Sequence, residues 1–145
     1  PAGVQFHHIA IEPMRVVLPA THRLAKKRKI ALSALAEDPF VMLPREASPT
    51  LHDVIVGACR EAGFEPIAGQ QAPQLSSVVN LVAAEFGVSL VPASVCQIQV
   101  EGVAYTDVLG NAISIRLVLA SRIEAAPAKT ANFLQKAVAL ASSVT

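Results

Sequence analysis

Tryptophan is absent from this chain of 145 residues, and aromatic side chains of any kind make up only 4% of it. Because 52% of the residues are hydrophobic, the core must be built from Val, Leu, Ile and Ala, a composition typical of buried α/β packing. Charged residues reach only 16%, so the chain has enough hydrophobic residues to fold, and a disordered chain is excluded. The net charge of +1 is too small to indicate a nucleic-acid surface.

Cysteine is also scarce, and the sequence lacks the common signatures of cofactor and metal binding. Cys59 and Cys96 have no CxxC spacing, so we expect two free thiols and neither a disulfide framework nor a zinc site. The phosphate-binding patterns GxGxxG and GxxxxGKS/T do not occur. The longest apolar run, residues 81–95, is interrupted by Glu85, Gly87 and Pro92 and is too short to span a membrane. No secretory signal peptide is recognisable.

The few residues that could carry chemistry are poorly placed for it. His7 and His8 are neighbours in a predicted strand, so they point to opposite faces and cannot chelate one ion. His52 and Cys59 are seven residues apart on a predicted helix, about 10 Å along its axis, which is too far for a nucleophile and its base. The carboxylates are scattered. We therefore expect no catalytic residue, no metal and no cofactor.

The hydrophobic periodicity predicts alternating strands and helices. Residues 4–18 read as one or two strands with a bend or crossing point at Pro13, and residues 21–29 as a polar loop. The basic run 26–29 within that loop could contact nucleic acid, but no aromatic residue is interleaved, which favours a solvated loop. Further strands are predicted at 40–43, 67–72, 88–91, 103–108 and 113–121, and helices at 33–37, from Ser48 or Thr50 to Gly63, at 74–86 and at 128–141. The order indicates an α/β domain with a mixed sheet.

Two of the predicted helix starts, Ser48-Pro49-Thr50 and Gln74 to Ser77, follow strands directly. Both should therefore lie at the carboxyl edge of the sheet, where open α/β sheets bind ligands. Free backbone N–H groups and the positive end of the helix dipole would favour a carboxylate there. The alternative is that these residues are only helix caps.

Several segments, in this order, are similar to the effector domains of LysR-type transcriptional regulators. Leu81 to Ser94 resembles the family's helix–glycine–strand–Pro-Ala-Ser joint, except that Glu85 replaces its first glycine. The other matching segments are Met14–Pro19 with His22–Ala25, Ile30–Leu35 with Asp38–Val41, Cys59–Pro66, and Gly102–Tyr105. Within the family, Val91–Ser94, Ile98, Glu101–Val103 and Tyr105 look most like the branch that controls aromatic-compound degradation, whose members often sense benzoate- or muconate-like acids.

This resemblance implies an α/β fold like that of type 2 periplasmic binding proteins, a mixed sheet with flanking helices, in which an inducer binds between two subdomains. Residues 1–12 would be the end of subdomain I and the crossover, 13–116 would form subdomain II, and 117–145 would return to subdomain I with a C-terminal helix. Leu51 stands where the aromatic-responsive branch can carry an aromatic residue, which is a departure from that pattern. The residues implied to line the cleft are Pro49, Thr50, Leu51, Gln74, Leu75 and Ser76.

The sequence thus predicts an inducer-sensing regulatory domain of a LysR-type transcription factor rather than an enzyme. The effector would be a small aromatic or dicarboxylic acid. DNA would be bound only through a helix-turn-helix outside this chain, with no membrane contact, and the protein would be a cytoplasmic homodimer or homotetramer. Because the chain begins Pro1-Ala2-Gly3 and has no counterpart of most of subdomain I, we expect a fragment of a longer regulator. The alternatives are a periplasmic solute-binding protein of the same fold and a small α/β enzyme.

Overall fold

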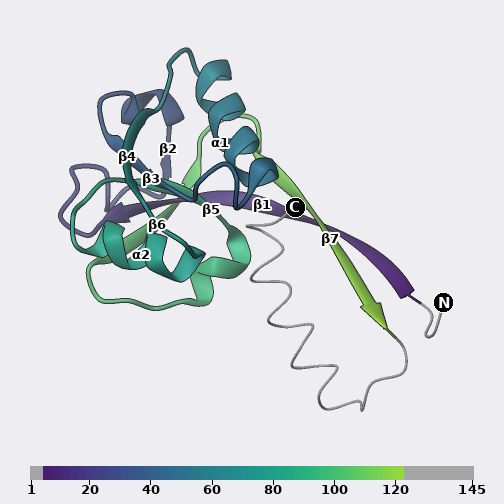
Figure 1. Ribbon diagram of the computed structural model, residues 1–145. Coiled ribbons are helices and arrows are strands. Elements are labelled where there is room, and N and C mark those ends of the chain that lie inside the picture. The colour runs from purple at the N-terminus through teal and green to yellow at the C-terminus, as the bar shows by residue number, and fades with distance from the viewer. Residues whose placement is uncertain (1–4, 123–145) are drawn as a thin grey trace.

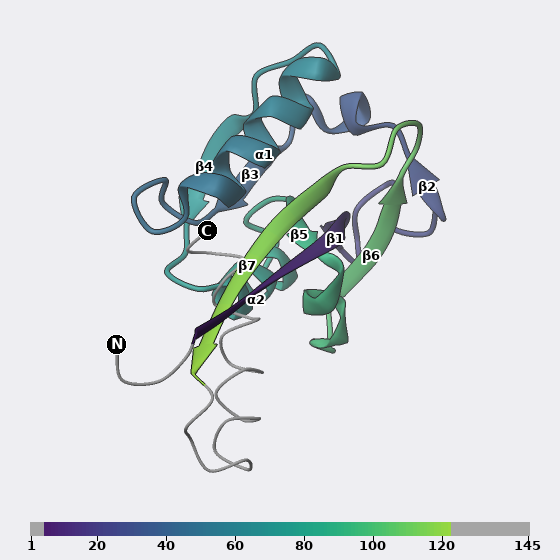
Figure 2. The same ribbon diagram turned by 90° about the vertical axis from the view of Figure 1, so that its right-hand side faces the viewer.

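The first strand, β1 (Gln5–Pro19), runs through two different parts of the molecule. The structure is a computed structural model that describes residues 5–122, and their side chains from 11 to 116. The first half of β1 pairs only with β7 (Ser114–Arg122), from Gln5↔Arg122 to Pro13↔Ser114. These two strands form an antiparallel ribbon that extends away from the body (Figures 1 and 2). The second half of β1 enters the main sheet.

In the main sheet, β1 lies between two strands that are distant in the sequence. It pairs antiparallel with β5 (Ser89–Pro92) on one side and with β6 (Val103–Val108) on the other. The short strand β2 (Lys29–Ile30) adds in parallel to β6. On the far side, β3 (Pro39–Met42) joins β5 through the parallel bridge Phe40↔Val88 and pairs in parallel with β4 (Ile67–Gln71). The resulting order β4-β3-β5-β1-β6-β2 is the mixed sheet that was predicted.

Two helices connect the parallel strands and lie on opposite sides of the sheet (Figure 1). Helix α1 (Pro49–Glu61) leads from β3 to β4, and α2 (Leu75–Ala83) leads from β4 to β5. Because β3 and β4 are parallel, both helices begin at the edge where these strands end. We call this edge the carboxyl edge and the opposite one the amino edge. The register Met42↔Gln71 places the ends of the two strands side by side, which confirms that both helix starts lie at one edge.

The core between these layers is almost entirely aliphatic, with one large aromatic exception. Phe40 is only 1% exposed, and its ring lies 6.2 Å from that of Phe64. Strand β5 is buried along its whole length, because sheet strands flank it on both sides and helices cover it. The inward residues of the helices include Leu51, Ile55, Ala58 and Cys59 on α1, and Leu75, Val78, Val79 and Val82 on α2.

Several predicted boundaries were wrong by a few residues. The segment predicted as a helix at 33–37 is a 3₁₀ turn over Leu32–Leu35 with Ala31 as its N-cap residue. A second 3₁₀ turn, Ala93–Gln97, follows β5 and was not predicted. Helix α1 begins at Pro49 with Ser48 in the N-cap position, so Thr50 is not its N-cap residue. Helix α2 ends at Ala83 and not at Phe86. The helix predicted at 128–141 lies outside the described residues.

The early end of α2 has a clear conformational cause at Glu85. This residue has φ 68°, in the left-handed region that glycine normally occupies after a helix. Its carboxylate accepts a hydrogen bond from the hydroxyl of Thr21, in the loop that follows β1. Gly87 therefore lies beyond the end of the helix, in the connection that leads to β5. A Cβ atom at this position would lie 2.3 Å from the carbonyl oxygen of Pro39.

Replacing Glu85 by glycine should stabilise the protein by about 0.5–1.5 kcal/mol. The substitution relieves the left-handed strain and removes a negative charge from a helix C-terminus, and these gains outweigh one exposed hydrogen bond. Chemical denaturation would measure the difference. Glu61→Gly is the matched control, because the same exchange in the last helical turn of α1 should cost up to about 1 kcal/mol. A loss of stability in both variants would contradict the assigned strain at Glu85.

Candidate functional site

The six residues predicted to line the cleft come together at the carboxyl edge in two groups of three. Pro49, Thr50 and Leu51 form the first turn of α1, and Gln74 is the N-cap residue of α2. Leu75 and Ser76 follow as the first residues of α2. The first N–H groups of each helix have no intrahelical carbonyl partner, so both helix starts present donors at this edge.

These residues differ in how their side chains are exposed. Pro49, Gln74 and Ser76 are exposed, and Thr50 is half-buried. By contrast, Leu51 is 2% exposed and Leu75 is 6% exposed, because both side chains pack into the core. A ligand at this edge would therefore meet the side chains of the four accessible residues, Pro49, Thr50, Gln74 and Ser76, and only the backbone N–H groups of the two leucines.

A carboxylate that the sequence analysis did not single out, Glu12, lies at the same edge. It precedes Met14, which pairs with Pro92 at the end of β5. The Oε1 atom of Glu12 accepts a 2.9 Å hydrogen bond from the backbone N–H of Ser94. Its Oε2 atom is buried and has no hydrogen-bond partner in the described part of the chain. Burying an unpaired acceptor is unfavourable, so this oxygen would gain from a hydrogen-bond donor.

The loop before α1 is tied to the helix by an ion pair. Both terminal oxygens of Asp53 accept hydrogen bonds from the Arg45 guanidinium, at 3.3 and 3.4 Å. This bond to Arg45 holds the pKa of Asp53 below its ordinary value. Asp53 therefore anchors the loop that leads into the helix.

A pocket of about 170 Å³ opens beside this loop, on the β4 side of the edge. None of the six predicted cleft residues lines it. Both charged and amide side chains face it, together with backbone from β4, but Arg45 is already engaged by Asp53. The pocket is lined by Phe40, Met42, Leu43, Arg45, Glu46, His52, Ala68, Gly69, Gln70 and Gln71.

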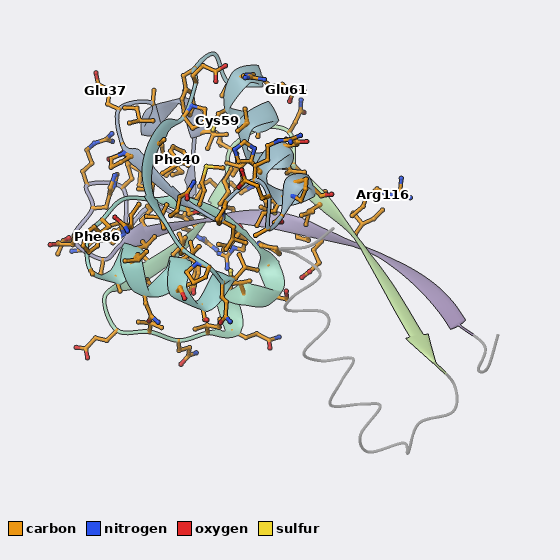
Figure 3. All side chains as sticks on the ribbon, viewed as in Figure 1. Glu37, Phe40, Cys59, Glu61, Phe86 and Arg116 are labelled. Atoms are coloured by element: carbon orange, nitrogen blue, oxygen red, sulfur yellow. The ribbon has the colours of Figure 1, made fainter. Side chains whose placement is uncertain are left out.

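The described residues contain no cluster of three or more His, Cys, Asp or Glu side chains that could hold a metal ion. Among the described helices, none combines the length and apolar character needed to cross a membrane. His52 and Cys59 both lie on α1, as expected, and Cys59 is fully buried against the core (Figure 3). Burial raises the pKa of the Cys59 thiol to about 12, so it stays neutral and is not an activated nucleophile.

Cys59 should make the protein lose stability in alkali. An unfolded thiol ionises near pH 8.5, whereas the folded one stays protonated up to about pH 12. Its stabilising contribution is therefore complete below about pH 8.5 and is lost as the pH rises toward 12. Between pH 8 and 10 we expect the wild type to lose about 1–2 kcal/mol more than Cys59→Ala, by urea denaturation at each pH. Cys96 and Tyr105 are present in both proteins, so their effects on the pH dependence cancel in the comparison. If the stability of the wild type and of Cys59→Ala falls in parallel with pH, the raised pKa is not that of Cys59.

The polar loop after β1 is held in place by His22, a role that the sequence analysis did not detect. The Nδ1 atom of His22 accepts the backbone N–H of Leu24 at 3.1 Å, so its Nε2 atom carries the proton and donates to Asp38 Oδ2 at 3.2 Å. Arg23 donates to the carbonyl of Ala34 at 2.7 Å. These bonds join the loop after β1 to the segment between β2 and β3. The family resemblance had matched these two segments only by their order in the sequence. Lys26, Lys27 and Arg28 are exposed in the predicted loop, whereas Lys29, which was predicted in the loop, begins β2.

Comparison with known proteins identifies the family of this chain. The family model described as "LysR substrate binding domain" matches residues 1–141. The chain belongs to this family. This LysR substrate-binding domain has the predicted fold, the type seen in type 2 periplasmic binding proteins. Its curated relatives are transcriptional regulators, which favours the regulator over the solute-binding protein and the enzyme.

The relatives are similar over most of this domain but are much longer. The domain is 32% identical over 127 residues to the HTH-type transcriptional regulator IlvR of Caulobacter vibrioides, covering 88% of this chain and 42% of that protein. It is 31% identical over 111 residues to the HTH-type transcriptional regulator CatR of Pseudomonas putida, covering 77% of this chain and 38% of that protein. The chain thus spans less than half the length of these relatives.

Solved structures share the fold. The effector binding domain of BenM with its effector benzoate superposes with a TM-score of 0.66 at 20% identity, covering 94% of this chain and 61% of that one. Corynebacterium glutamicum OxyR gives a TM-score of 0.68 at 28% identity, covering 100% of this chain and 49% of that one.

Proposed function

We propose that this domain binds a small aromatic or dicarboxylic acid at its carboxyl edge and that the bound acid is the inducer of a LysR-type regulator. The observation that carries the proposal is the meeting of two helix N-termini at one edge of the sheet, in a chain of this family. Two sets of backbone N–H groups can hold a carboxylate without any formal positive charge. The effector residues would be Pro49, Thr50, Leu51, Gln74, Leu75 and Ser76.

The remaining wall of the cleft would come from subdomain I. In this proposal residues 13–116 form subdomain II, residues 1–12 the crossover, and residues 117–145 the return to subdomain I. The change of partners along β1, from β7 up to Pro13 to β5 from Met14 onward, supports a boundary at this position.

Assignment to the aromatic-responsive branch is the finer part of the proposal. It is supported by the similarity to CatR and by the fold shared with BenM, whose structure contains benzoate as effector. Glu12 narrows the range of acids that would bind at this edge. Its carboxylate repels a ligand that carries only negative charge, and it can accept a hydrogen bond from a ligand that also carries a donor. Acids that also carry a hydroxyl or amino group should therefore bind more tightly than those that carry only carboxylates.

A thermal-shift screen tests the proposed inducer class. The panel would contain benzoates and dicarboxylic acids, each with and without a hydroxyl or amino group, and the protein would include the whole of subdomain I. A ligand at 100 times its dissociation constant stabilises the folded state by about 2.7 kcal/mol, which such a screen detects easily. If no member of the panel raises the melting temperature, an acidic inducer is excluded.

Removing the two hydroxyls at the helix starts should weaken binding of the best acid. Thr50→Ala and Ser76→Ala each delete a potential donor to an anion, a loss of about 1.5–3 kcal/mol, or roughly 10- to 100-fold in dissociation constant. Isothermal titration calorimetry would measure it. Ser33→Ala, at an exposed residue of the 3₁₀ turn before β3, is the matched control and should leave the affinity unchanged. Equal affinities in all three variants would remove Thr50 and Ser76 from the site.

For the complete protein we propose a cytoplasmic homodimer or homotetramer that binds DNA through a helix-turn-helix outside this chain. DNA binding by the complete protein is supported by the solved structure of full-length CbnR with its target DNA, which shares this fold, and the helix-turn-helix by the HTH-type name of the relative IlvR. We propose no catalytic step, metal or cofactor for this domain.

A further inference from the structure

The pocket of about 170 Å³ beside the start of α1 is separate from the proposed effector site. It lies between the loop that leads into this helix and the outermost strand β4, and none of the six proposed effector residues lines it. Figure 2 shows α1 beside β3 and β4. The volume corresponds to roughly six water molecules at about 30 Å³ each, whereas pockets for drug-sized ligands have roughly 300–1,000 Å³. The pocket therefore suits a small ligand.

A β-bulge in β4 shapes one wall of this pocket. Phe40 pairs with Ala68 and Met42 pairs with Gln71, so two steps along β3 correspond to three along β4. A Cβ atom on Gly69 would lie 2.9 Å from the carbonyl oxygen of Phe40, so a glycine is needed where the two strands come this close. A bulge redirects the side chains around it, and here all three of these β4 residues line the pocket.

Opposite charges lie next to each other on the wall formed by the loop before α1. Arg45 and Glu46 are consecutive and exposed, and both line the pocket. The Nε and Nη2 atoms of Arg45 donate to Asp53, so the N–H groups of its Nη1 atom remain without a partner among the described residues. Glu46 forms no ion pair within the part of the chain that the structure describes. The pocket thus offers both donors for an anionic group and an acceptor for a cationic one.

The rest of the lining includes an apolar surface and an unsatisfied ring nitrogen. Met42 is half-buried and Leu43 is buried, and both face the pocket. The Nδ1 atom of His52 is buried and has no hydrogen-bond partner in the described range, since the Oδ1 atom of Asp53, 3.5 Å away, is too distant for a good hydrogen bond. A buried polar atom without a partner is unfavourable, so a ligand that carries polar groups is favoured over a purely apolar one.

We propose that this pocket binds a small zwitterion, an α-amino acid with a short aliphatic side chain, as a second ligand of the domain. Its ammonium group would donate to the Glu46 carboxylate, and its carboxylate would accept from the Nη1 atom of Arg45, both as charge-assisted hydrogen bonds. The aliphatic side chain would cover Met42 and Leu43. A simple carboxylic acid would bring a second negative charge to Glu46, and a simple amine would leave Arg45 without its anion. The proposal does not depend on the identity of the inducer, because the inducer would bind at the two helix starts.

Isothermal titration calorimetry on the complete protein tests the ligand class with L-valine and its two truncated forms. Isovalerate lacks the amino group of valine, and isobutylamine lacks its carboxylate. L-Valine should bind roughly tenfold or more tightly than either, because each truncated form loses one charge-assisted hydrogen bond. L-Phenylalanine, which has the same two charged groups and a much larger side chain, should not bind. Absence of valine binding, or equal affinities for valine and its truncated forms, would overturn the proposal.

Paired substitutions test whether the bound valine occupies this pocket. Glu46→Gln removes the partner of the ammonium group and should weaken valine binding roughly tenfold, whereas Glu61→Gln, at an exposed glutamate of α1 outside the pocket, should not change it. Ala68→Leu fills the pocket from an exposed position and should abolish binding. Ala84→Leu, at an exposed alanine after α2, is its control. Unchanged valine affinity in both Glu46→Gln and Ala68→Leu, each folded by circular dichroism, would place the amino acid elsewhere and overturn the proposal.

Discussion

Replacing Gly87 by alanine should destabilise this domain by about 3–5 kcal/mol, a large share of the roughly 5–15 kcal/mol by which folded proteins are ordinarily stable. Gly87 has φ 155°, and an added Cβ would lie 2.3 Å from the carbonyl oxygen and 3.0 Å from the carbonyl carbon of Pro39. These atoms belong to the backbone of β3 and cannot rotate away. The cost combines an unfavourable backbone conformation with overpacking, each about 1–3 kcal/mol. Urea denaturation followed by circular dichroism would measure it.

Two other glycines separate the causes of this effect. Gly57 lies within α1 with open space around it, so Gly57→Ala should stabilise the protein by about 0.5–1 kcal/mol. Gly63 has φ 95° but no atom within 4 Å of an added Cβ, so Gly63→Ala should cost about 1–2 kcal/mol through strain alone. If Gly87→Ala is no worse than Gly63→Ala, the close approach to Pro39 is not what requires glycine.

Replacing Phe40 by alanine should cost about 3–5 kcal/mol, as expected for a buried aromatic side chain that leaves a cavity. Phe40 is 1% exposed in β3, between β4 and β5, where it pairs with Ala68 and bridges to Val88. Losing this side chain removes the packing that joins the β3–β4 pair to the main sheet. The free energy of unfolding from chemical denaturation is the measurement.

Phe86→Ala is the matched control for this substitution. The Phe86 side chain is 51% exposed (Figure 3), so its removal should change the stability of a single copy by no more than about 0.5 kcal/mol. Comparable losses at Phe40 and Phe86 would mean that Phe40 does not carry the core packing described above.

The elements of the fold were predictable wherever periodicity is strong. The helix predicted from Ser48 or Thr50 to Gly63 and the strands predicted at 103–108 and 113–121 agree with α1, β6 and β7 to within a few residues. The end of α2 was predicted wrongly, because the usual rule assigns the left-handed position to glycine and here Glu85 occupies it. A single sequence gives no sign that a glutamate will accept this strain.

The candidate site was only partly accessible to sequence reasoning. Helix starts after parallel strands can be placed at the carboxyl edge from element order alone, so Thr50 and Ser76 could be named. The burial of Leu51 and Leu75 depends on how each helix rotates against the sheet. The position of Glu12 depends on strand pairing with residues about 80 positions away. Such pairing has no local signature in the sequence.

The pairing of β1 also determines when the domain can fold during synthesis. All three strands that pair with β1 come late in the chain, and the earliest residue to pair with it is Ser89. At 5–20 residues per second, a ribosome needs roughly 4–14 s to add the about 70 residues between Pro19 and Ser89. During that time the apolar segment Met14 to Leu18 has emerged without its partners. The domain therefore completes its central sheet only after β5, β6 and β7 have been synthesised, and its first strand is the part most dependent on protection from aggregation until then.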